Sequence, residues 1–197
     1  MEELQDYSGP LSRDLQPRVS LDAFSKDAIV RMTAEATKLY LGSEGGCYTV
    51  ARKRFGEELA NHMDRELWLE RAAPQVVARL RKLFRIDGDD VASFLKFLQI
   101  EPLFAINLVE YELREPKLGV VTVRRCRSLE YFERHGEEGL QKNACGMHAS
   151  GLQRTARDFN PQMRVKAVTL PPRQITMGNP GRKQPPIACR WEVTIED

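Results

Sequence analysis

At 197 residues the chain has the length of one ordinary domain, or of one domain with a helical extension, and 42% of its residues are apolar, as in an average globular protein. The formal net charge is only +2 and both signs alternate along the chain, which argues against a nucleic-acid groove. No apolar run approaches the roughly 20 residues that span a bilayer, and the acidic, polar first residues do not resemble a signal peptide. We therefore expect a cytoplasmic protein that binds neither nucleic acid nor membrane.

The first hundred residues carry the apolar spacing of helices. Residues 1–20 are the exception, because they contain turn-forming Gly and Pro with little periodicity, and we expect them to form an extended arm. Beyond the arm the spacing predicts four helical segments. These segments are 21–42, 44–56, 57–86 and 87–102.

Capping and breaking residues mark the ends of these segments. Gly42 is expected to stop the first helix, and Pro74 is expected to kink or divide the long third one. Short polar side chains that can accept a hydrogen bond from the first turn precede the first and the fourth helix. They are Asp22 or Ser25 for the first helix, and Asp89 or Asp90 for the fourth.

The pattern changes to that of strands after residue 102. Residues 104–115 alternate between apolar and polar, residues 118–126 are rich in Val and Thr, and a short reversal joins them, so we expect an antiparallel hairpin. Four more elements are expected beyond it: helices at 128–136 and 146–160, and strands at 163–170 and 187–196. The Pro-rich loop 171–186 between the last two strands is typical of a binding lid or a mobile surface loop.

These elements predict an α+β fold. A helical part, 21–102, is expected to pack on a small antiparallel sheet of about four strands within 103–197, together with two further helices. We expect residues 21–197 to form a single domain with the helices on one face of the sheet. The sequence does not decide the oligomeric state, and a homodimer stays an open alternative.

Three of the four cysteines lie in the sheet-containing part, and a histidine lies near one of them. Cys126 ends the second strand of the hairpin, Cys145 is expected to open the longer helix, and Cys189 lies in the last strand. His148 follows Cys145 by almost one helical turn. In a reducing compartment clustered thiols indicate metal binding or catalysis rather than disulfides. Three thiols and an imidazole make a full tetrahedral set for zinc, and thiolates also suit iron.

Two other interpretations fit the same residues. Free cysteine is often a buried apolar residue, and the helix bearing Cys145 shows a core-like stripe. That stripe comprises Cys145, His148, Leu152, Ala156 and Phe159. Alternatively, the expected position of Cys145 at a helix start, with His148 in reach, favours a thiolate nucleophile. The separations of 19, 3 and 41 residues among the four candidate ligands do not decide between these readings.

Three residues near the cysteines are candidates for substrate binding. Trp191 lies two residues after Cys189 and should share its face of the strand, where it would be core or the wall of a pocket. Arg190 and Arg173 could hold a carboxylate through bidentate hydrogen bonds.

Several segments spread over most of the chain carry a resemblance to known proteins. They are "DYSGP" (6–10), "FSKDAIVRM" (24–32), "RFGEELA" (54–60), "FNPQMRVKAVTLPPR" (159–173) and "CRWEV" (189–193), together with Cys126, Cys145 and His148. The chain resembles a poorly characterised prokaryotic family known as similar to L-2-amino-thiazoline-4-carboxylic acid hydrolases. More distantly, it is similar to the vinyl-reductase type of small-molecule-binding domain, in which clustered C-terminal cysteines bind zinc beside a ligand pocket. The resemblance implies that Cys126, Cys145 and Cys189 are metal ligands, whereas a further ligand in such domains can be acidic in place of His148.

Two functions are therefore expected as alternatives. The first is a zinc- or iron-dependent hydrolase of a small cyclic amidine or amide, with His148 as general base or fourth ligand and with loop 171–186 closing over the substrate. The second is a non-catalytic small-molecule-binding or sensor domain. Its four ligands would form a closed structural zinc site, and an apolar pocket would be lined by Trp191, Phe132 and Phe159.

Overall fold

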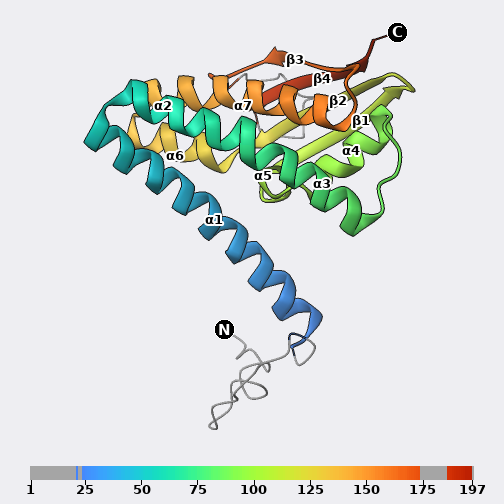
Figure 1. Ribbon diagram of the computed structural model, residues 1–197, viewed down its shortest axis with the longest axis horizontal. Helices are drawn as coiled ribbons and strands as arrows, with labels where there is room; N and C mark the ends of the chain where they lie inside the picture. Colours follow the sequence, from blue (N-terminus) through green and yellow to red (C-terminus); the bar gives the residue numbers. More distant parts are fainter. Residues whose placement is uncertain (1–20, 22–23, 174–185, 197) are drawn as a thin grey trace, which may run out of the picture. The chain divides into compact units, whose positions relative to one another are not determined.

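The computed structural model describes residue 21 and residues 24–173 and 186–196 (Figure 1). The expected arm 1–20, the cap Asp22 and most of the expected lid, residues 174–185, lie outside the described residues. The described chain combines many helices with one four-stranded antiparallel sheet, so the predicted α+β class is confirmed.

The chain divides into two units, Met1–Gly46 and Cys47–Asp197, and the division falls within helix α1 (Lys26–Phe55). Ser25 caps α1, because its Oγ accepts a hydrogen bond from the N–H of Ala28 at 3.1 Å, as predicted. The prediction that Gly42 stops the helix was wrong. Glycine inside a helix costs only about 1 kcal/mol, so it weakens a helix without obliging it to end. The expectation of one domain over 21–197 stays a prediction.

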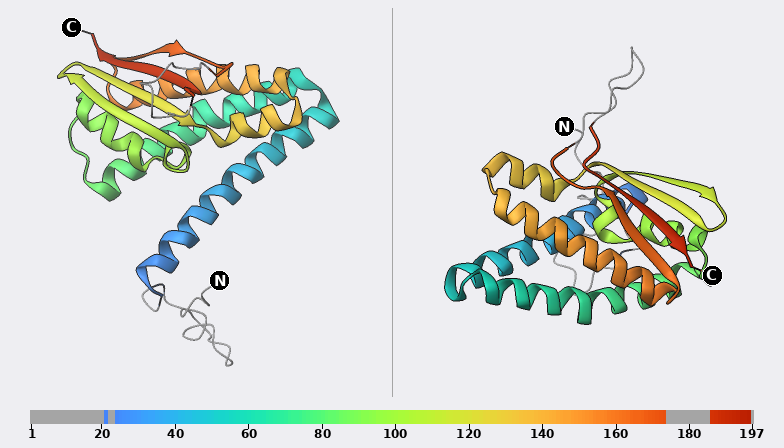
Figure 2. Two further views of the ribbon diagram at one scale, coloured as in Figure 1. Left: turned by 180° about the vertical axis from the view of Figure 1, so that it is seen from behind. Right: turned by 90° about the horizontal axis from the view of Figure 1, so that it is seen from above.

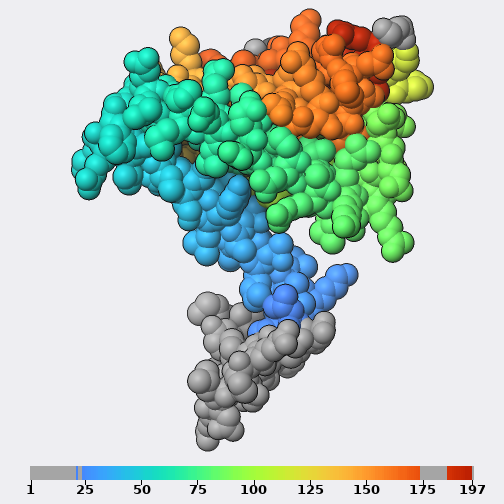
Figure 3. Space-filling model, viewed as in Figure 1, coloured from blue at the N-terminus to red at the C-terminus, as the bar shows by residue number. Residues whose placement is uncertain are grey.

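The predicted helix 57–86 is divided close to Pro74. Its parts are α2 (Glu57–Glu66), the π-helical η3 (Leu67–Ala72) and α3 (Ala73–Phe84). Proline lacks the N–H that an α-helix needs, and its ring collides with the carbonyl four residues earlier. The wide π turn lies directly before this position and accommodates the irregularity. The α3 segment lies beside the later helix α7 (Glu138–Phe159), and their side chains form one continuous surface (Figure 3).

Two short helices precede the sheet, and a carboxylate caps each of them. In α4 (Val91–Ile100), the Oδ1 of Asp90 accepts a hydrogen bond from the N–H of Ser93 at 2.7 Å, which confirms the predicted cap. In α5 (Pro102–Ala105), the Oε2 of Glu101 accepts from the N–H of Phe104 at 3.1 Å. Because α5 occupies the expected start of the hairpin, the first strand begins later than predicted.

The sheet has the strand order β1-β2-β4-β3, and all neighbouring strands are antiparallel. The strands are β1 (Leu108–Glu115), β2 (Leu118–Arg125), β3 (Met163–Thr169) and β4 (Cys189–Ile195). Helix α6 (Arg127–His135) follows β2, and α7 leads into β3. In the central pair, Val123 near the end of β2 faces Cys189 at the start of β4. This pairing brings two of the candidate cysteines to the same end of the sheet.

The main core lies between the sheet and the helices α4 and α7, which cover one of its faces (Figure 2). Phe94 of α4 meets Phe159 of α7 edge to face, with 5.3 Å between ring centroids, and both side chains are buried. Trp191 and Val121 supply the floor of this core from the sheet. Within the unit Cys47–Asp197, the expectation that helices cover one face of the sheet is confirmed.

Gly119 of β2 lies at a close approach between α4 and the sheet. A Cβ at this position would stand 2.8 Å from the Cγ1 of Val91 and 3.1 Å from the Cδ1 of Leu95. We expect Gly119→Ala to lower the free energy of unfolding by about 1–3 kcal/mol, because α4 would have to move off the sheet.

The matched control is Gly151→Ala in α7, where the added methyl group meets nothing within 4 Å. It should raise the free energy of unfolding by up to about 1 kcal/mol, because alanine is the better helix former. Urea unfolding of both variants measures the sign of each change in the free energy of unfolding. Equal changes in the two variants would contradict the close approach of α4 at Gly119.

Candidate functional site

Cys126 is the N-cap residue of α6, at the point where the chain leaves β2 and turns into the helix. Its half-buried side chain packs against the small apolar cluster of Val123, Leu129 and Ala188. Burial raises the pKa of the Cys126 thiol, while the N–H groups of Leu129 and Ser128 and the charge of Arg173 act in the opposite direction. The N–H groups at the start of α6 and the positive charge of Arg173 therefore both favour the thiolate form of Cys126.

Cys189 approaches the same apolar cluster from the first position of β4. The indole Nε1–H of Trp191 donates a hydrogen bond to the Sγ of Cys189 at 3.2 Å. Burial raises the pKa of this thiol to about 12, the hydrogen bond from Trp191 opposes the rise, and Cys126 and Cys145 add to it. Trp191 itself is buried, which confirms the core interpretation, whereas its role as the wall of a pocket stays a prediction.

Cys145 lies inside α7 rather than at its start. The helix begins at Glu138, directly after Gly136 ends α6 with a φ of 66°. The prediction that Cys145 opens the helix was therefore wrong, because the helix break lies at Gly136 and not before Gly146. An argument from the helix dipole does not apply to this thiol. Burial raises its pKa to about 11, and Cys126 adds to the rise.

The three thiols come from three different elements and lie within electrostatic reach of one another. Cys126 adds to the rise in the pKa of Cys145, and Cys126 and Cys145 both add to that of Cys189. We call Cys126, Cys145 and Cys189 the three-thiol cluster. All three are free cysteines, and with raised pKa values they are neutral thiols at neutral pH. As these side chains stand, the described residues contain no group of three or more His, Cys, Asp or Glu placed to hold a metal ion.

His148 follows Cys145 by about one turn of α7. Its side chain reaches the surface, but desolvation lowers the pKa of its imidazole, which favours the neutral form. Further along the same helical face, Leu152, Ala156 and Phe159 are buried in the core. The expected core stripe is thus confirmed from Leu152 onward, whereas Cys145 is half-buried at its edge. A role for His148 as ligand or base stays a prediction.

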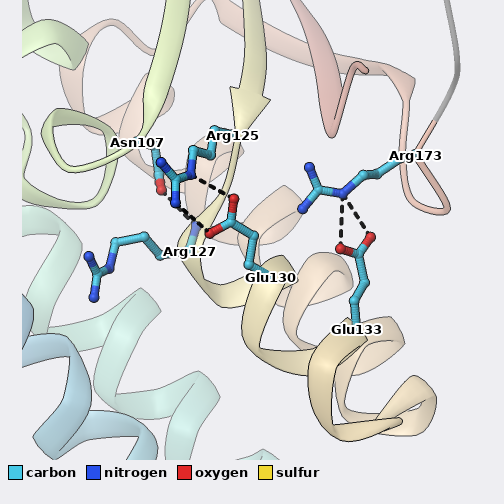
Figure 4. Close-up of polar contacts among 6 residues, drawn as sticks. All are labelled: Asn107, Arg125, Arg127, Glu130, Glu133 and Arg173. Carbon is cyan, nitrogen blue, oxygen red and sulfur yellow. Dashed lines mark hydrogen bonds and ion pairs between the residues drawn. The ribbon is translucent and has the colours of Figure 1, made fainter. Parts of the chain in front are cut away.

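The two candidate arginines lie on different sides of the sheet. Arg190 is adjacent to Cys189 in β4, so its side chain points to the opposite face, where its Nε donates to the Oγ1 of Thr122 at 3.1 Å. Arg173 lies on the side of the three-thiol cluster, where its charge acts on Cys126. Its Nε donates to both carboxylate oxygens of Glu133 on α6, at 2.8 and 3.0 Å (Figure 4).

A polar brace holds the turn at Cys126, and the sequence did not indicate it. The Oδ1 of Asn107 accepts a hydrogen bond from the backbone N–H of Arg127 at 3.0 Å, and the Nε of Arg125 donates to Glu130 at 2.7 Å (Figure 4). The hydrogen bond and charge of Arg125 lower the pKa of the Glu130 carboxyl. These contacts join residues on both sides of a strand–helix junction, for which no periodicity rule exists.

Comparison with known proteins finds no matching family model, no matching curated protein and no matching solved structure. The resemblance to the thiazoline-carboxylate hydrolase-like family and to vinyl-reductase-type domains therefore stays a prediction. Among the described helices, none is long and apolar enough to cross a bilayer.

Proposed function

We propose that this protein holds a thiophilic metal ion, zinc with iron as the alternative, on Cys126, Cys145 and Cys189. The observation that carries the proposal is the convergence of three thiols from a strand–helix turn, a helix and a strand. Three sulfur donors are the ligand set that zinc and iron prefer, and cytosolic conditions would keep them reduced.

Burial disfavours thiolates in the three-thiol cluster, but several neighbouring groups act against it. The indole N–H of Trp191 already reaches the sulfur of Cys189, and the first N–H groups of α6 and the Arg173 guanidinium favour a charged Cys126. Hydrogen bonds and cations of this kind hold ligands in place around metal sites. Binding would require the three side chains to turn toward one another, and two of them stand at the ends of elements, where such turning is easiest.

We further propose that the site hydrolyses a small cyclic amidine or amide. A bound zinc ion supplies a Lewis acid that can lower the pKa of a coordinated water to about 7. The exposed imidazole of His148 would accept a proton as general base. Arg173 would bind a substrate carboxylate by exchanging its hydrogen bonds with Glu133, whereas Arg190 faces the other side of the sheet.

A second candidate is a non-catalytic small-molecule-binding or sensor domain with a closed zinc site. The contact of Cys189 with the core residue Trp191 favours it, because structural sites are built into the packed interior. In that case His148 would be the fourth ligand. A hydrolase would bind the metal with three protein ligands and leave one position open, whereas the closed site would have four protein ligands.

Cobalt(II) added to the metal-free protein without oxygen tests the ligand set, because its sulfur-to-cobalt absorption reports the number of thiolates bound. We expect Ser in place of Cys126, Cys145 or Cys189 to remove about a third of this absorption each, or to abolish binding. Cys47→Ser is the matched control, since Cys47 is an exposed thiol outside the cluster, and it should leave the spectrum unchanged.

His148→Ala separates the two functions. In a hydrolase it should retain cobalt with the same sulfur absorption and lose turnover of small cyclic amidines, whereas in a closed site it should change the cobalt spectrum itself. Absence of a sulfur-to-cobalt band in the unaltered protein, or its loss on replacing Cys47, would contradict the proposed site.

A further inference from the structure

We propose that Cys126 and Cys189 are a redox pair, which a hydroperoxide oxidises to a disulfide within the domain. The disulfide would remove two of the three thiolates and so release the metal. Metal release rests on the proposed function, whereas formation of the disulfide does not.

The geometry of β2 and β4 brings these two thiols together. Cys189 is paired with Val123 across the two strands, and the N–H of Ala188 donates to the carbonyl oxygen of Val123 at 2.8 Å. Cys126 follows Val123 by three residues, and its side chain turns back onto the cluster of Val123, Leu129 and Ala188 that Cys189 also contacts. Both sulfurs therefore lie against the same apolar cluster at one end of the sheet.

Both residues stand at the ends of elements, whereas Cys145 stands inside one. The strand β2 ends at Arg125, so Cys126 is outside the ladder, and Cys189 is the first residue of β4. Cys145 lies in the interior of a 22-residue helix, where the backbone cannot shift without breaking helical hydrogen bonds. A disulfide requires a Cα separation below about 7 Å and a narrow dihedral range, so we favour the pair at element ends, which needs no shift inside a helix.

The oxidation proceeds in two steps, and we assign the first to Cys126, which stands outside the ladder of β2 at the start of α6. The Cys126 sulfur takes the outer oxygen of the hydroperoxide and becomes a sulfenic acid, and the O–O bond breaks to leave an alcohol, or water from hydrogen peroxide. The Cys189 sulfur then attacks the sulfenic sulfur, the S–O bond breaks, and the S–S bond forms with loss of water. Two electrons pass from the two sulfurs to the peroxide, and both thiol protons leave in the products.

The test uses the full chain with Cys47→Ser, which removes the exposed thiol outside the three-thiol cluster and leaves three cysteines. The protein is loaded with zinc, its metal content is measured, and a small excess of hydrogen peroxide is added. We expect loss of two hydrogens from the intact mass, a fall from three alkylatable thiols to one, and release of the bound zinc. Non-reducing peptide mapping should find Cys126 joined to Cys189.

Two further variants in the same background locate the pair. Adding Cys145→Ser should leave the disulfide intact, whereas adding Cys189→Ser should abolish it and carry Cys126 on to the sulfinic acid. Circular dichroism of each reduced variant shows whether it is folded. Three thiols that survive peroxide, or a disulfide that depends on Cys145 and not on Cys189, would overturn the inference.

The metal measurement separates this inference from the proposed function. Reduced protein that holds no zinc would overturn the metal site, and the mass and mapping results would still decide whether the disulfide forms. Zinc that binds to the reduced protein and stays bound after the disulfide has formed would overturn the release step alone.

Discussion

Replacing Glu101 with Gln should remove a loss of stability that the unaltered protein suffers as the pH rises from about 4.5 to about 7. The side chain of Glu101 is buried between α4 and α5, where it caps α5. Burial raises the pKa of this carboxyl from 4.5 to about 7, although the N–H groups of Phe104 and Leu103 oppose the rise. The nearby Tyr111 hydroxyl donates to the carbonyl oxygen of Leu98, and burial and the charge of Glu101 raise its pKa as well.

The direction of the effect follows from proton binding. Below pH 4.5 the Glu101 carboxyl is protonated in both the folded and the unfolded chain, so it causes no loss of stability. Between pH 4.5 and about 7 the unfolded chain releases this proton while the folded protein keeps it, and folding becomes less favourable with each step in pH. The full shift corresponds to about 3 kcal/mol.

Urea unfolding at several pH values measures this effect as the difference between Glu101→Gln and the unaltered protein. The difference in free energy of unfolding should grow by about 3 kcal/mol in favour of the variant over that range and stay constant above it. Taking this difference cancels the contributions of other titrating groups to the free energy of unfolding. One such group is Asp90, whose pKa is lowered by its hydrogen bonds with Ser93. Glu115→Gln, at an exposed position of β1, should show no such growth. A difference for Glu101→Gln that does not change with pH over this range would mean that the pKa of this carboxyl is not raised in the folded protein.

If the proposed site holds zinc, zinc should raise the free energy of unfolding by about 4 kcal/mol when its free concentration is about a thousand times its dissociation constant. The reason is that zinc would bind the folded site and not the dispersed thiols. Cys189→Ser should lose most of this gain, since it removes a ligand and the acceptor of the Trp191 hydrogen bond. Cys47→Ser should keep all of it. Thermal unfolding with buffered zinc measures the three proteins side by side.

The number of protons released on zinc binding tests the same proposed site independently. The three thiols are neutral in the metal-free protein, because burial raises their pKa values, and each must lose its proton to become a ligand. Calorimetry in buffers of different ionisation enthalpy should therefore find that zinc displaces about three protons at neutral pH. In Cys189→Ser this number should fall by about one. Zinc binding without proton release would exclude the thiols as its ligands.

Local rules predicted those elements whose ends carry strong signals. Asp90 could be identified as a cap because a short acceptor side chain stands directly before an apolar helix, and its hydrogen bond to Ser93 confirms this. The hairpin of β1 and β2 follows from alternation on both sides of a short reversal. The continuous α1 was missed because glycine lowers helix stability by an amount that the rest of a long helix can outweigh.

The candidate site was predictable only in part. Antiparallel pairing of the last strand with the hairpin predicts that Cys126 and Cys189 approach each other, but not which residues stand opposite. Alternation along β4 places Arg190 on the face opposite Cys189 and Trp191, so the strand pattern alone separates this arginine from the two thiol-side residues. The start of α7 could not be located, because Gly136, Gly139 and Gly146 are equal candidates for the break in the sequence. Only the left-handed backbone at Gly136 identifies it.

The most direct test of the metal site is elemental analysis of protein purified without oxygen or chelator, alongside Cys145→Ser and Cys47→Ser. The proposed site predicts about one zinc or iron per chain in the unaltered protein and in Cys47→Ser, and almost none in Cys145→Ser. Cys145 is the informative position, because it lies in the interior of α7. If this thiol only packed in a core stripe, its replacement by serine would not change the metal content. An absence of metal from all three proteins, with Cys145 slow to react with a thiol probe, would contradict the site and leave the three thiols as packing residues.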